Sequence, residues 1–142
     1  TLLALAGGAL SGAALAAELA ERARAAVADQ PFVLDDGSLL SKTCSIGFCC
    51  FPLATQHADA LGWGAVVNIA DAALYAVKSA GRNGWLGALS VRSESAEAVL
   101  AWSRRPLADW ARSGDLNVVW SPDHGGLTAA QLQTATPQVE TV

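Results

Sequence analysis

The residues best suited to chemistry are two cations four positions apart, Lys78 and Arg82. Lys78 falls in the last turn of an expected helix, on the same face as Asp71 and Tyr75, and Arg82 follows the glycine that ends this helix. A lysine point charge beside a planar guanidinium suits a chain of phosphates. The helix dipole alone also favours basic residues at this end, and from the spacing alone that structural role is the simpler interpretation.

The cysteines and histidines are the other candidates. Cys44, Cys49 and Cys50 lie on one expected strand, and an odd number without a histidine cluster predicts reduced core cysteines rather than disulfides or zinc. Because Cys49 faces away from the other two, we expect one of the three to be exposed, with a redox role as the alternative. The two histidines are His57 and His124, and because the sequence has no nucleophile elbow to pair with either of them, hydrolase chemistry is disfavoured. The sequence also has no Walker loop, dinucleotide glycine motif or HExxH.

The composition predicts a globular domain in a reducing compartment. The chain has 142 residues, of which 52% are hydrophobic and 15% charged, so it can bury a core. A net charge of −4 disfavours binding to nucleic acid, which needs a basic face. The first twenty residues are apolar, but glycines and Glu18 interrupt them and no basic region precedes them, so we expect neither a membrane segment nor a secretory signal.

The first half of the chain reads as a strand, a helix and a hairpin. An apolar strand over residues 2–6 and a glycine-rich turn precede a helix over 12–28. We expect the apolar face of this helix to contain Leu15, Leu19, Ala23 and Ala26, with Glu18 and Arg22 paired on the other side. The Asp35-Asp36-Gly37 turn then predicts a hairpin returning into one half-buried strand over residues 39–51.

The second half predicts a helix and a strand, followed by a segment of shorter elements. An apolar stripe predicts a helix over residues 63–80, with Gly81 as its left-handed cap and a strand over 85–91. Ser93 is expected to cap a helix over 94–103, and a helix over 106–114, a strand over 116–120 and a flexible tail over 121–142 follow. Trp102, Trp110 and Trp120 cover the open end of the core, the arrangement we favour, or form an interface.

Three blocks of the sequence resemble GGDEF domains, the diguanylate cyclase family. Residues 70–83, ADAALYAVKSAGRN, are similar to the helix near the end of these domains, and TCSIGF at 43–48 is similar to the strand written vtvSIGva. AERAR at 20–24, followed by Pro31-Phe32, resembles the central helix and the start of the next strand. The blocks occur in family order and together cover residues 1–88. The GG(D/E)EF signature, the metal-binding aspartate, the guanine-reading residues and the RxxD inhibition motif have no counterpart here.

The resemblance implies an α+β fold, a ferredoxin-like or nucleotide-cyclase palm with a mainly antiparallel sheet. Residues 1–90 correspond to the C-terminal half of such a domain, its N-terminal half missing, with an extension over 91–120 and the tail over 121–142. The family condenses two GTP into cyclic di-GMP in a homodimer with Mg²⁺, in the cytoplasm, where this chain would belong to the cytoplasmic end of a larger sensor protein. Lys78 and Arg82 match the pair that contacts the terminal phosphates of GTP, and Arg22 matches a secondary cyclic di-GMP contact or is a solvated arginine paired with Glu18.

The resemblance assigns no catalytic residue and no metal ligand to this chain, so we expect the 142-residue polypeptide alone to make no cyclic di-GMP. The alternative is a non-catalytic, degenerate GGDEF-type module for regulation or dimerisation. Exposed sheet edges favour self-association in that case.

Overall fold

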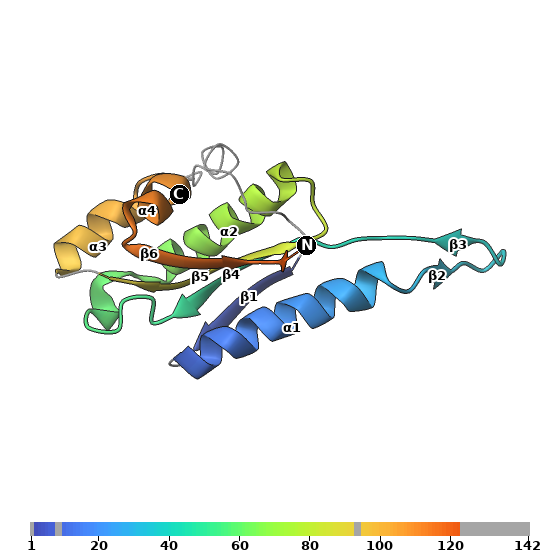
Figure 1. Cartoon of the computed structure of the whole chain (residues 1–142), viewed down its shortest axis with the longest axis horizontal. Helices are drawn as coiled ribbons and strands as arrows, with labels where there is room; N and C mark the ends of the chain where they lie inside the picture. Colours follow the sequence, from blue (N-terminus) through green and yellow to red (C-terminus); the bar gives the residue numbers. More distant parts are fainter. Residues whose placement is uncertain (1, 8–9, 93–94, 123–142) are drawn as a thin grey trace.

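The computed structural model describes residues 2–7, 10–92 and 95–122 as an α+β fold around a four-stranded sheet (Figure 1). The strands run in the order β1 (Leu2–Gly7), β4 (Ile46–Phe51), β5 (Trp85–Val91) and β6 (Leu116–Trp120). β4 is parallel to both of its neighbours, and β6 pairs with β5 in the antiparallel sense. The α+β class is confirmed, but the expectation of a mainly antiparallel sheet is wrong for the described strands. Helical crossovers join β1 to β4 and β4 to β5, and such connections produce parallel neighbours.

The two long helices lie on opposite faces of this sheet (Figure 1). α1 (Leu10–Ala28) packs on the face that carries Phe48, and α2 (Trp63–Ser79) packs on the face that carries Cys49. The central strand β4 is therefore buried on both sides. The predicted half-buried strand is wrong in this respect, because a strand covered by a helix on each face has no solvent side.

One of the two crossover connections between parallel strands is left-handed, which is rare. The steps from β1 to β4 and from β4 to β5 move in the same direction across the sheet, yet their helices lie on opposite faces. Two such steps have the same hand only if their helices share a face, so one of the two is left-handed. About 98% of parallel crossovers are right-handed.

α1 presents alanines to the sheet instead of leucines. Ala16 and Ala20 are buried against Phe48, whereas Leu15 and Leu19 are about half exposed, at 54% and 52%. The expected apolar face is therefore wrong at both leucines and at Ala26, which is exposed as well. The bulky aromatic side chains of the sheet fill this layer, so small residues allow the helix to come close.

α2 follows its predicted pattern and lies very close to β4. Its stripe, which is buried as expected, comprises Val66, Ala70, Ala73, Leu74 and Val77. A Cβ atom added at Gly47 would collide with the backbone oxygen of Ala70 and with the backbone nitrogen of Leu74. Glycine is therefore required at this position of the strand, because the obstacle is helix backbone, which cannot move aside.

A hairpin arm, residues 30–43, extends away from the body beyond α1 (Figure 1). β2 (Phe32–Val33) pairs with β3 (Leu39–Leu40) around the predicted turn, where Gly37 has a φ of 79°. The expected single strand over 39–51 is thus divided into β3 and β4. Every residue of the arm is exposed.

The C-terminal part completes the same sheet. α3 (Ala96–Ser103) is capped by Ser95, whose hydroxyl accepts from the backbone N–H of Ala98, and the expected cap Ser93 lies outside the described residues. α4 (Leu107–Ser113), which ends at Gly114 as predicted, buries Trp110 in the core as we favoured. Half-buried Trp102 also packs against this core and lies under the Arg105 guanidinium, which is 4.5 Å from the ring centre. Trp120 is partly exposed.

The expected tail does not begin at Ser121. This residue is buried, donates its backbone N–H to the Trp85 carbonyl at 3.0 Å and accepts the Trp85 N–H through its hydroxyl at 3.2 Å. Residues 123–142 of the expected tail, His124 among them, lie outside the described residues. The division into segments 1–90 and 91–120 stays a prediction.

The close approach of α2 gives a stability prediction. Gly47→Ala is expected to destabilise the chain by about 3 kcal/mol or more, because overpacking against backbone forces the helix away from the strand. Gly64→Ala is the matched control. It lies in α2 with nothing near its added Cβ and is expected to stabilise by about 0.5–1 kcal/mol. Urea unfolding of both variants measures the difference, and equal stability of the two variants would contradict the packing described.

Candidate functional site

The turn after α2 holds three consecutive residues in left-handed conformation. Gly81 has a φ of 115°, as its predicted capping role requires, and Arg82 and Asn83 follow with φ of 64° and 51°. The Arg82 N–H donates to the Val77 carbonyl at 3.0 Å, which closes the end of the helix. Left-handed conformation costs a non-glycine residue about 1–2 kcal/mol, with asparagine tolerated best. The turn therefore depends on stabilising contacts from elsewhere.

Those contacts come from α1, through Arg24. Its Nη1 donates to Oδ1 of Asn83 at 3.1 Å, while its Nε and Nη2 bind the carboxylate of Glu21 at 3.1 and 2.6 Å. Glu21 in turn accepts from the indole Nε1 of Trp85 at 2.8 Å. The Arg24 side chain is only 12% exposed. Hydrogen bonds to charged groups are worth about 1.5–3 kcal/mol, enough to offset the cost of the turn.

This network replaces the ion pair predicted on α1. The sequence spacing suggested Glu18 with Arg22, but the pair that forms is Glu21 with Arg24, one turn further along. The hydrogen bonds from Arg24 hold the pKa of Glu21 below its ordinary value, against the opposing effect of burial, and the Trp85 indole adds to the lowering. The carboxylate is therefore charged at neutral pH, as the network requires.

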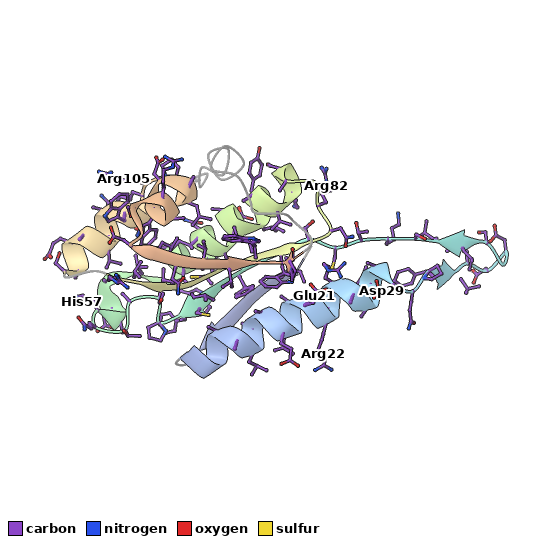
Figure 2. All side chains as sticks on the ribbon, in the orientation of Figure 1. Glu21, Arg22, Asp29, His57, Arg82 and Arg105 are labelled. Carbon is purple, nitrogen blue, oxygen red and sulfur yellow. The ribbon has the colours of Figure 1, made fainter. Side chains whose placement is uncertain are left out.

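The structure places both predicted phosphate-binding cations at the same end of α2. Lys78 lies half-buried in the last helical turn and Arg82 stands exposed just beyond it (Figure 2). Asp71 and Tyr75 are exposed on the same helix, as expected for residues that share its outer face. The arrangement presents positive charge at a helix C-terminus, and it can bind an anion with several oxygens.

Arg22 does not belong to this site. It is exposed on α1, and Figure 2 shows it directed away from the sheet, whereas Arg82 follows α2 on the opposite face. The secondary cyclic di-GMP contact suggested for Arg22 therefore stays a prediction about a separate surface.

The cysteines and His57 contribute no reactive site. Cys49 and Cys50 are buried, and burial raises the pKa of both thiols, that of Cys49 to about 12. Cys44, which precedes β4, is half-buried because it packs beside Ala23 of α1, so the expectation of an exposed cysteine is wrong. All three are free cysteines, as predicted. His57 lies half-buried in the loop before the short 3₁₀ helix η1 (Ala58–Ala60).

The metal implied by the family resemblance does not fit the part of the chain that the structure describes. No group of three or more His, Cys, Asp or Glu side chains gathers there as a metal site. Mg²⁺ prefers carboxylate oxygens and water, and within the described ranges no such cluster lies beside Lys78 and Arg82. Among the described helices, none is long and apolar enough to cross a membrane.

Comparison with known proteins yields one short similarity. The chain is 41% identical over 68 residues to an uncharacterised protein, YhcK, of Bacillus subtilis strain 168. The matched segment covers 48% of this chain but only 18% of that protein. No protein-family model matches the chain. No solved structure matches it either.

The depressed pKa of Glu21 predicts how stability depends on pH. A carboxyl group whose folded pKa is lowered stabilises the protein above its unfolded value of about 4.3, and this contribution is lost as the pH falls through the folded value. Because the Glu21 side chain is 37% exposed, we expect Glu21→Gln to cost about 1 kcal/mol at pH 7 and almost nothing near pH 3.

Denaturant unfolding at the two pH values measures this loss. Asp109→Asn is the matched control, because Asp109 and Arg112 form an exposed pair of the same i, i+3 spacing. Its effect is expected to stay within about 0.5 kcal/mol at both pH values. A cost of Glu21→Gln that does not change with pH would show that the charge of this carboxylate contributes nothing.

Proposed function

We propose that this chain supplies the terminal-phosphate-binding corner of a GGDEF-type domain, in which two GTP molecules are condensed into cyclic di-GMP. The observation that carries the proposal is the end of α2. There, Lys78 in the last turn and Arg82 in a left-handed turn leave the same helix end, within the block of sequence that resembles the family. The two other resembling blocks supply the helix and the central strand that hold this turn in place.

The role of the two cations is electrostatic. In phosphoryl transfer, catalysis comes mainly from positioning and from neutralising charge on the phosphate oxygens. Lys78 offers a point charge, and Arg82 offers a planar fork that can bind two oxygens at once. Together they bind the β- and γ-phosphates of GTP and stabilise the pyrophosphate as it leaves.

The proposal predicts that the chain binds pyrophosphate through these two residues. Lys78→Ala and Arg82→Ala are each expected to weaken binding roughly tenfold, since losing one charge-assisted hydrogen bond costs about 1.4 kcal/mol or more. Nuclear magnetic resonance titration of ¹⁵N-labelled chain with sodium pyrophosphate gives the affinities.

Lys42→Ala is the control for the loss of one positive charge, because Lys42 is exposed in the hairpin arm. It is expected to leave the affinity within twofold. Equal weakening by all three substitutions would reduce the binding to a non-specific charge effect and contradict the proposal.

A non-catalytic interaction module is the second candidate, and the hairpin arm favours it. In the arm, Phe32 pairs with Leu40 and Val33 pairs with Leu39, so both faces of the two-stranded sheet are apolar. Val33 and Leu39 are 72% and 66% exposed. An isolated hairpin is marginally stable in water, so packing on a second copy of the chain would stabilise this one. Leu15 and Leu19 add exposed apolar surface on α1.

If the arm mediates self-association, the double substitution Val33→Lys and Leu39→Lys is expected to convert a dimer into a monomer. Two charges placed directly opposite on one face repel each other and cannot be buried against a partner. Size-exclusion chromatography with light scattering measures the mass. Leu100→Lys, on partly exposed Leu100 of α3, is the control and is expected to leave the mass unchanged. A monomeric wild-type chain would eliminate this candidate.

A further inference from the structure

The Arg24 network connects the two faces of the sheet at one point. Arg24 belongs to α1, which covers one face, and its partner Asn83 belongs to the turn after α2, which covers the other. The contact joins residues 59 positions apart. Asn83 directly follows Arg82 and precedes the first hydrogen bonds between the turn and the sheet, where the Gly84 carbonyl accepts from Ile46 at 2.9 Å.

We propose that Arg24 is a positioning residue for the phosphate site. By holding Asn83 in left-handed conformation, it fixes the backbone from which Arg82 projects, so a residue of α1 sets the geometry of a site formed by α2. This inference rests on the proposed function for its phosphate, but the conformation of the turn is a separate observable.

The hydrogen bonds around Arg24 hold its side chain in the orientation that this role requires. The Glu21 carboxylate accepts hydrogen bonds from Nε and Nη2 of Arg24 and is itself held by the Trp85 indole N–H. The guanidinium therefore has one defined orientation, with Nη1 directed at Asn83. Trp85 opens β5, two residues after Asn83, and packs in the cluster that contains Ala20. The end of the turn that leads into β5 is therefore tied to α1 twice, once through Asn83 and once through Trp85.

A structural role alone would not require the contact with Asn83. The ion pair with Glu21 already neutralises the largely buried guanidinium, and the Glu21–Trp85 bond already ties α1 to the sheet. The Asn83 bond acts specifically on the conformation of a residue next to Arg82. Removing Arg24 should therefore change the turn and the phosphate affinity together, even where the chain remains folded.

The experiment is a double-mutant cycle between Arg24→Ala and Asn83→Gly. Glycine adopts left-handed conformation without strain, so the turn of Asn83→Gly does not need Arg24. The full chain and its variants are titrated with sodium pyrophosphate. Arg24→Ala is expected to lower the affinity about fivefold in the wild-type background and less than twofold in the Asn83→Gly background, a coupling of about 0.5–1 kcal/mol. Equal losses in the two backgrounds would overturn the proposal.

A second measurement reads the turn without any ligand. Residues with positive φ give a strong nuclear Overhauser effect between their own amide and Hα protons, and Asn83 should show it in the wild type but lose it in Arg24→Ala. Arg112→Ala, which breaks the exposed pair with Asp109, is the control and should change neither measurement. Arg24→Lys keeps the charge and is expected to retain part of the affinity.

The two measurements separate the failure of this proposal from that of the proposed function. If the wild type binds no pyrophosphate but Arg24→Ala still changes the turn, the phosphate site is wrong and the control of the turn by Arg24 stands. If binding occurs and Arg24→Ala leaves both the turn and the affinity unchanged, Arg24 is not a positioning residue.

Discussion

The contact between α2 and β4 at Gly47 is the constraint on which the rest of the structure depends. With no side chain at this position, the helix backbone lies directly against the strand, and this distance sets where α2 ends relative to the sheet. Lys78 and Arg82 are carried by that end. Gly47 therefore helps to determine where Lys78 and Arg82 lie relative to the sheet, although it belongs to a different block of the sequence.

The second constraint is electrostatic and comes from the opposite face. Arg24 and Glu21 on α1 compensate the backbone strain of the turn at Arg82 and Asn83, so the turn is stable only when both helices are in place. A site on one helix is thereby made sensitive to the position of the other. The covering of both faces also explains why the cysteines of β4 are buried and why the pKa of each thiol is raised.

Features that follow from local pattern could be predicted from the sequence. The stripe of α2 has a clear helical period, and Gly81 and Gly114 mark helix ends because glycine tolerates positive φ. The predicted burial of Leu15 is wrong, because alanines occur on every side of α1 and the sequence does not show which side faces the sheet. Parallel pairing and the Arg24–Asn83 contact are non-local. The only sequence signals for that contact were a second arginine on the helix and an asparagine after Arg82, neither of which names a partner.

We propose that the end of α2 binds the terminal phosphates of a nucleotide and not its base or sugar. The most direct measurement compares GTP with GMP, which lacks those phosphates, by mapping the amide shifts of the ¹⁵N-labelled chain. We predict that GTP shifts the amides of residues 78–83 and that GMP at the same concentration leaves them unmoved. Shifts of equal size with both nucleotides, or shifts confined to another part of the sheet, would contradict the claim.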